Sequence, residues 1–240
     1  MNTPVHNNIS EPYVPETAFG KWFLRTNIWT QQVLERAICD VERLIPERHR
    51  SYETVVDVGC GYGRSLKKLN ERFLPQQLIA MDIDPEMLEF AAKEAKRNNV
   101  KVDFIQGSSS ALRLEDDSVD LLFCHQTFHH LIEQEQAINE FYRVLKPGGI
   151  LLFAESTRRY IHSWIIKLLF RHPMEVQKTA SQYLAVINKA GFHLSDDAIS
   201  YPYLWWSRED LGIMQNWFGI QPKAEREETL VNLVAIKPIL

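Results

Sequence analysis

Much of the chain alternates short apolar runs with stretches in which apolar residues recur every three or four positions. The apolar runs predict β-strands, at residues 54–58, 78–82, 101–105, 119–124 and 150–154. The periodic stretches between them predict helices, at residues 63–73, 85–97 and 134–145. Strands that alternate with helices in this way are typical of an α/β fold, with a parallel sheet that carries helices on both faces.

Helical periodicity also precedes and follows this core. Residues 16–44 predict a helical segment that is rich in aromatic side chains from Phe19 to Trp29 and that ends before Pro46. After the fifth strand we expect further elements: helices at 158–171 and 175–190, strands at 193–200 and 230–236, and between these two strands a helix from about Arg208 with Ser207 as its cap. The two late strands predict an antiparallel hairpin at the sheet edge, which gives a seven-stranded mixed sheet in the order 3-2-1-4-5-7-6.

We therefore expect a single α/β domain over residues 46–240, with a helical insertion at about 157–190. Residues 1–45 are expected to form a tail and a helical lid segment. The composition, with 45% hydrophobic residues, 24% charged residues and a net charge of -4, fits a soluble globular protein and disfavours one that wraps nucleic acid. The three scattered cysteines favour a cytoplasmic protein, as does an N-terminus unlike a secretory signal, and no uncharged run is long enough to span a bilayer.

The strongest chemical signal is the run from Val55 to Gly63, in which a strand leads into glycines at alternating positions and then into a helix. Glycine allows a sharp turn and lets a ligand lie against the backbone, and a helix N-terminus offers free N–H groups. The G-x-G-x-G spacing differs from the G-x-G-x-x-G of dinucleotide sites. Asp57, two residues before the first glycine, would repel a pyrophosphate but could receive an ammonium group, through water.

A second acid, Asp82, ends the second predicted strand about 20 residues beyond the glycines, where a carboxylate can accept both hydroxyls of a ribose. Asp84 competes for this role, but its place before Pro85 makes it the expected cap of the next helix.

Taken in order, these and later motifs resemble those of class I, Rossmann-like methyltransferases, most of all the methyltransferase type 11 group. The motifs are Asp57-Val-Gly-Cys-Gly-Tyr-Gly63, Asp82, Phe104-Ile-Gln-Gly-Ser108, Asp116-Asp-Ser-Val-Asp-Leu-Leu-Phe123, His129-His-Leu131 and Arg143-Val-Leu-Lys-Pro-Gly-Gly149. The close resemblance runs from Tyr52 to Glu155. It implies a Rossmann-like fold and S-adenosylmethionine as cofactor, and it leaves the methyl acceptor open.

The resemblance also implies a set of site residues. The candidate cofactor-binding residues are Asp57, Gly59, Gly61, Asp82, Ile83, Ser108, Ser109 and His125. Ser108 stands where the family often has an acid that bonds the adenine amine, so this contact would lack a charge. His125, at the end of the fourth strand, would lie beside the donor methyl group.

Methyl transfer from a sulfonium needs a base only when the acceptor loses a proton as it attacks. The candidate catalytic residues are His125 and His130, and His129 is a further candidate base. His130 matches a histidine that in this family usually packs beneath the sheet, so a structural role competes with the catalytic one. No metal site is predicted.

The expected acceptor is a small apolar or aromatic metabolite. Two segments motivate it: the run from Tyr201 to Trp206, and the predicted helix 158–171, a basic amphipathic segment with an apolar face made of Ile161, Trp164, Ile165, Leu168 and Leu169. This helix could instead lie on a membrane surface. Other functions stay open: a tRNA or protein substrate, an NAD-dependent oxidoreductase, and a regulatory relative without catalysis. A homodimer is compatible with the sequence.

Overall fold

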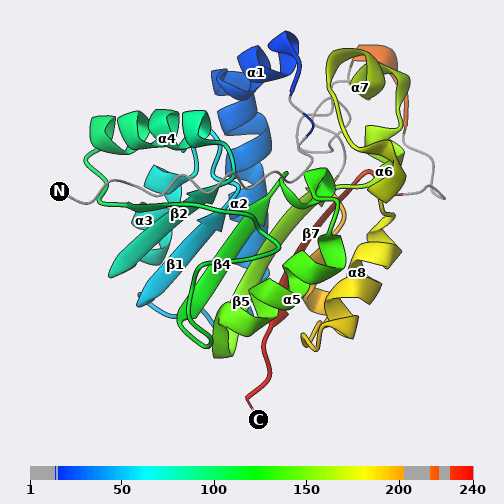
Figure 1. Ribbon diagram of the computed structural model, residues 1–240. Coiled ribbons are helices and arrows are strands. Elements are labelled where there is room, and N and C mark those ends of the chain that lie inside the picture. Colours follow the sequence, from blue (N-terminus) through cyan, green and yellow to red (C-terminus); the bar gives the residue numbers. More distant parts are fainter. Residues whose placement is uncertain (1–13, 15, 203–216, 222–227, 240) are drawn as a thin grey trace.

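The computed structural model describes residues 14, 16–202, 217–221 and 228–239. Within these residues one sheet contains seven strands in the order β3-β2-β1-β4-β5-β7-β6, as predicted (Figure 1). The strands are β1 Thr54–Val58, β2 Gln77–Asp82, β3 Asp103–Gln106, β4 Val119–His125, β5 Leu145–Ser156, β6 Ile199–Ser200 and β7 Leu230–Ile236. β1 to β5 pair in parallel, whereas β7 runs antiparallel to both β5 and β6.

Helices cover both faces of this sheet. The α-helices are α1 Ala18–Leu24, α2 Glu35–Arg43, α3 Leu66–Phe73, α4 Pro85–Arg97, α5 Gln134–Val144, α6 Arg158–Ile161, α7 Trp164–Leu169 and α8 Ala180–Lys189. Shorter turns are η1 Trp29–Leu34, η2 Phe128–His130, η3 Met174–Val176 and η4 Asp196–Ala198, of which η1 is a π-helix and the others are 3-10 helices. α5 and α8 lie in front of the sheet in Figure 1, and α2 and α3 lie behind it.

The core has two halves because successive strand residues point to opposite faces. Val55 belongs to the cluster that packs under α2, α3 and α4, whereas Val56 and Val58 belong to the cluster under α5 and α8. All five residues of β1 are buried, as expected for the central strand of a parallel sheet. The sheet therefore holds the carboxyl ends of β1, β2 and β4 rigidly side by side, at the point where the strand order reverses.

Most of the predicted core elements are confirmed, with small changes at their ends. β1, β7 and α4 have the predicted bounds, and Asp84 caps α4 by accepting the Glu86 N–H at 2.9 Å. α3 begins at Leu66 instead of Gly63, because the glycine-rich turn continues to that point. The predicted strand 193–200 shortens to β6 and an isolated bridge between His193 and Ile236.

The predicted helices after β5 are wrong in their extent. Residues 158–171 form two short helices, α6 and α7, and the predicted apolar face is not a single buried stripe: Trp164 is 77% exposed and Leu168 71% exposed. Ile166, which the prediction left off that face, is buried. The predicted helix 175–190 becomes η3 followed by α8, which starts at a capping box between Thr179 and Gln182.

The predicted helix near Arg208, with its cap Ser207, and most of the run from Tyr201 to Trp206 lie outside the described residues. In the described part of the chain, every helix is too short or too polar to cross a bilayer.

Candidate active site

A cavity of about 370 Å³ opens at the carboxyl ends of β1, β2 and β4. Three groups of residues line it: the glycine-rich turn after β1, the ends of β2 and β4, and side chains from the segments before β1 and after β5. Of the predicted site residues, Asp57, Gly59, Gly61, Asp82, Ile83, Ser109, His125 and His130 line the cavity. Ser108 is not among them.

The glycine-rich turn is held against the neighbouring strand and leaves its backbone open to the cavity. The backbone N–H groups of Gly59 and Cys60 both donate to the carbonyl oxygen of Met81, at 2.8 and 2.9 Å. Gly61 has a φ of +51°, and a Cβ built on it would meet no atom within 4 Å. Gly63 serves packing instead, because a Cβ there would lie 2.7 Å from Cα of Ala91 in α4. A ligand can therefore approach the backbone at Gly61 itself.

Asp82 links this turn to the next helix. Its Oδ2 accepts the Gly61 N–H at 2.8 Å, and its Oδ1 accepts the Asp84 N–H at 3.0 Å. Burial raises the pKa of Asp82, and the backbone donors at Asp84 and Gly61 oppose that rise. Each carboxylate oxygen has further lone pairs, so the group can still accept hydrogen bonds from a ligand in the cavity.

The side chain of Asp57 is more deeply buried than that of Asp82. Ser65 donates a short hydrogen bond from its hydroxyl to Asp57 Oδ2. Burial raises the pKa of Asp57 to about 7, the Ser65 hydrogen bond lowers it, and the nearby Asp82 carboxylate adds to the rise. A cation in the cavity would favour the ionised form of Asp57.

The loop after β3 differs from the prediction in one respect. Ser108 is buried, and its hydroxyl lies 2.8 Å from Ser110 Oγ and accepts the Ser110 N–H at 3.0 Å. Ser109 and Ser110 line the cavity, as does Ile83 from the loop after β2. Sequence reasoning missed Ser110, because which of three successive serines faces a ligand depends on how the loop turns. In the present geometry Ser108 holds the loop and its neighbours form the wall.

The shape of that loop also depends on Arg143 in α5. Its guanidinium donates to the carbonyl oxygens of Leu112 and Leu114, both at 2.9 Å, and pairs with Glu140 and Asp116. Glu140 in turn accepts the Leu112 N–H at 2.8 Å. The arginine of the predicted late motif thus fixes the cavity wall from behind.

His125 is the last residue of β4 and is buried beside the cavity. Its Nε2 has no hydrogen-bond partner among the described residues. The ring lies between aromatic neighbours, 5.8 Å from the Phe123 centroid and 5.7 Å from the Trp29 centroid. Burial lowers the pKa of His125 to about 3, with a smaller contribution from His129. The imidazole is therefore neutral at pH 7, and the free nitrogen can accept or donate one hydrogen bond according to its tautomer.

A second group of histidines lines the cavity beyond His125. The ligand nitrogens of His129, His130 and His172 all lie within 4.8 Å of one another. His129 Nδ1 is 2.6 Å from Oε2 of Glu155, which is fully buried. The sequence indicated His129 and His130 as adjacent candidates, but it gave no sign of His172 or Glu155, because their approach depends on the path of the chain after β5.

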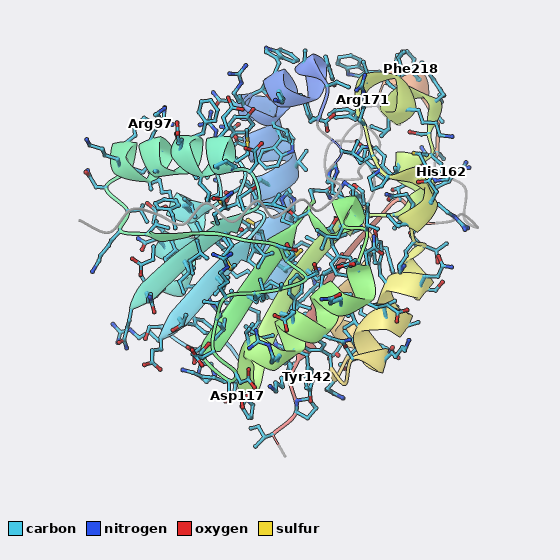
Figure 2. The ribbon with its side chains drawn as sticks, viewed as in Figure 1. Arg97, Asp117, Tyr142, His162, Arg171 and Phe218 are labelled. Carbon is cyan, nitrogen blue, oxygen red and sulfur yellow. The ribbon has the colours of Figure 1, made fainter. Side chains whose placement is uncertain are left out.

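The segments at the two flanks of the domain core meet over the cavity. Phe23, Trp29 and Phe170 all line it, and the ring centroids of Phe23 and Phe170 are 5.9 Å apart. Thr17 Oγ1 donates to the carbonyl oxygen of Leu169 at 2.5 Å. Arg171, at the top of the view in Figure 2 near α1 and α7, donates its backbone N–H to Glu16 at 3.0 Å. These contacts give the cavity an apolar, aromatic part in addition to the glycine-rich turn.

Comparison with known proteins relates the sheet and its glycine-rich turn to a known family. Residues 56–153 match the family described as a methyltransferase domain. This part of the chain is similar to a methyltransferase domain. The matched segment begins in β1 and ends in β5, so it includes the glycine-rich turn, Asp82 and His125. S-adenosylmethionine is the cofactor that this family and the neighbouring structures imply.

Curated relatives match between 45% and 62% of this chain. An uncharacterised methyltransferase-like protein of Schizosaccharomyces pombe is 39% identical over 114 residues, covering 48% of this chain and 42% of the relative. A malonyl-[acyl-carrier protein] O-methyltransferase of Yersinia pestis is 33% identical over 45% of this chain and 38% of the relative. A demethylmenaquinone methyltransferase of Deinococcus radiodurans is 28% identical over 62% and 58%. The chain thus matches about two fifths to three fifths of the length of these relatives.

Solved structures share the fold of nearly the whole chain. A methyltransferase bound to the Trm112 activator of Haloferax volcanii has a TM-score of 0.67 at 22% identity, covering 92% of this chain and 96% of that one. The [4+2]-cyclase SpnF has a TM-score of 0.62 at 23% identity, covering 85% and 80%. At these identities the similarity establishes the class I methyltransferase fold alone, which hosts more than one reaction.

Proposed function

We propose that this protein transfers the methyl group of S-adenosylmethionine to a small apolar or aromatic metabolite. The observation that carries the proposal is one continuous cavity with two unlike sides. The glycine-rich turn and Asp82 form the polar side, the aromatic residues of the flanking segments form the apolar side, and His125 lies between them. Such a cavity suits a polar cofactor and an apolar acceptor held together.

The polar side fits the cofactor residue by residue. Gly61 exposes its backbone where a ligand can approach, and Asp82 has lone pairs left for the ribose hydroxyls. The buried carboxyl group of Asp57 would gain a cationic partner in the cofactor ammonium. Ile83 and Ser109 line the part of the cavity where the adenine would lie. When bound, S-adenosylmethionine supplies an electrophilic methyl group and a neutral leaving group.

The apolar side favours a small acceptor over a macromolecule. Phe23, Trp29 and Phe170 present ring surfaces to the cavity, and Ile161 and Ile166 line it as well. Burying an apolar acceptor against such surfaces gains about 25 cal/mol for each Å² removed from water. It also excludes water from the reacting groups, so the protein contributes mainly alignment and desolvation.

His125 would orient the acceptor. Its unpartnered Nε2 can bond an acceptor hydroxyl, and its neutral state at pH 7 keeps a lone pair available in the appropriate tautomer. With a pKa of about 3 in the ligand-free protein, the imidazole is a weak base. We therefore assign it to positioning the nucleophile, and to taking up a proton only as the positive charge of the sulfonium disappears during transfer.

The test is transfer of an isotopically labelled methyl group. The purified protein is incubated with methyl-labelled S-adenosylmethionine and, in separate reactions, with fractionated small metabolites, with tRNA and with total protein. We expect label in a small apolar molecule, at a rate that falls at least about tenfold in His125→Ala through loss of acceptor alignment. Label confined to tRNA or protein would refute the substrate class. Cofactor binding without transfer to any fraction would favour a non-catalytic relative.

A further inference from the structure

Three histidines form a compact cluster in the wall of the cavity. His129 and His130 belong to η2, and His172 comes from the segment after α7. Their ring centroids lie 4.3 Å apart for His129 and His130, 5.1 Å for His129 and His172, and 4.8 Å for His130 and His172. Three imidazoles side by side at the edge of a cavity are a common arrangement of metal ligands.

Glu155 orients the first of these rings. Its Oε1 accepts the backbone N–H groups of Thr127 and Phe128 at 2.8 and 2.7 Å, and its Oε2 faces Nδ1 of His129 at 2.6 Å. A carboxylate held in this way fixes the proton of the imidazole on Nδ1, which leaves Nε2 of His129 as a free ligand. Metal-binding histidines are oriented by the same carboxylate–histidine pairing.

Gln177 holds the third histidine near the other two. Its amide nitrogen donates to the carbonyl oxygen of His129 at 2.8 Å and to that of Pro173 at 2.7 Å. Pro173 directly follows His172, so this buried side chain ties the segment that carries His172 to the segment that carries His129. The cluster is thus fixed from two sides by groups that are themselves buried.

We propose that His129, His130 and His172 bind one divalent transition-metal ion, of the class represented by Zn²⁺, and that the ion keeps an open coordination position towards the cavity. Imidazole ligands suit zinc and its neighbours in the first row, and three protein ligands with one open position are typical of catalytic zinc sites. Zn–N distances near 2.0–2.1 Å place tetrahedral ligands about 3.3 Å apart, so ring nitrogens that lie within 4.8 Å of one another would approach by up to about 1.5 Å on binding the ion.

The open position gives the ion a use in the proposed reaction, and this step rests on the proposed function. An acceptor oxygen, nitrogen or thiol bound to the ion would be acidified and held in the same cavity as His125. The acceptor would then carry a polar reacting group on an otherwise apolar body.

Metal binding is tested without cofactor or acceptor, on protein that has no affinity tag and has been treated with chelator. Co²⁺ is titrated in while the visible absorption of tetrahedral cobalt is followed, and Zn²⁺ is titrated by calorimetry. We expect one ion of each per chain, and displacement of Co²⁺ by Zn²⁺. The absence of a one-to-one signal, or an octahedral cobalt spectrum with weak binding, would overturn the proposal.

His172→Ala and His162→Ala form the matched pair of variants. His162 is exposed in the turn between α6 and α7 and is not one of the three clustered histidines. We expect His172→Ala to weaken Zn²⁺ binding at least about 100-fold, and His162→Ala to bind as the parent does. Equal affinity in the parent and His172→Ala would refute the site.

Glu155→Gln is a second variant, which should weaken binding by about 10- to 100-fold through loss of the oriented tautomer. Binding of S-adenosylmethionine, measured in parallel, shows that each variant is folded. Metal binding and methyl transfer are measured in separate assays, so the two proposals can fail independently. Metal binding can be absent while methyl transfer persists, and metal can bind to a protein that transfers no methyl group.

Discussion

Asp82→Asn removes one charge and one acceptor from the side chain that we assign to the cofactor ribose. In the parent protein the Asp82 carboxylate accepts the N–H groups of Gly61 and Asp84, and the residue lines the cavity. The amide of the variant can keep one of these backbone contacts through its oxygen, but its NH₂ group must face a donor at the other. Asp84→Asn is the matched control, because Asp84 is absent from the cavity lining and asparagine also caps helices well.

Charged hydrogen bonds contribute about 1.5–3 kcal/mol each, and water replaces part of what is lost when one partner is removed. We therefore expect Asp82→Asn to weaken S-adenosylmethionine binding by about 1–3 kcal/mol, or roughly 5- to 150-fold in Kd. Asp84→Asn should leave Kd within about a factor of two, because its helix cap is retained.

Calorimetry with two ligands separates a direct contact from a loosened loop. The parent and Asp82→Asn are each titrated with S-adenosylmethionine and with its 2′-deoxy analogue, which forms a double-mutant cycle. A direct contact predicts that the variant loses less affinity for the deoxy ligand than for the full cofactor. Equal losses for both ligands would show that Asp82 acts only through the Gly61 turn, and unchanged affinity for both would refute the ribose assignment altogether.

Three further predictions follow from the same geometry. The pKa of Asp57 is about 7 in the free protein, and a bound cation lowers it. Cofactor affinity, measured by calorimetry, should therefore fall about tenfold as the pH is lowered from about 8 to about 6. In Asp57→Asn the affinity should not change over this pH range. Gly63→Ala should lower the free energy of unfolding by about 2–4 kcal/mol, because Gly63 has a φ of +70° and its new Cβ would press on Ala91. Gly219→Ala, whose Cβ would meet no atom within 4 Å, should lower it by only about 1–2 kcal/mol. Thermal unfolding of both variants checks these values. Deleting residues 1–30 should leave a folded protein with a similar Tm and impaired turnover, because this segment is assigned to the lid; wholesale unfolding or full activity would contradict that role.

The strand order and the glycine-rich part of the cavity wall were predictable because they follow from local signals. An apolar run followed by closely spaced glycines and a helix specifies a strand, a tight turn and an open helix N-terminus within a few residues. Right-handed crossovers between parallel strands then leave few ways to arrange the sheet. Asp82 could be placed for the same reason, since it ends the strand next to the one that carries the glycines.

The elements after β5 were predicted less well because their structure depends on contacts with distant parts of the chain. The periodicity of residues 158–171 suggested one amphipathic helix, yet the chain breaks between α6 and α7, and Leu169 instead accepts a hydrogen bond from Thr17. Helix propensity is a weak local preference that tertiary contacts readily override.

The sequence by itself thus determined the α/β fold, the glycine-rich turn and the acids beside it, because each depends on neighbours along the chain. Only the tertiary structure decided which serine faces the cavity, and that His172 joins His129 and His130. It also decided that Glu155 orients His129 and that Phe170 meets Phe23. These contacts join residues that are far apart in the sequence, and their positions are set by how the segments at the two flanks pack over the sheet.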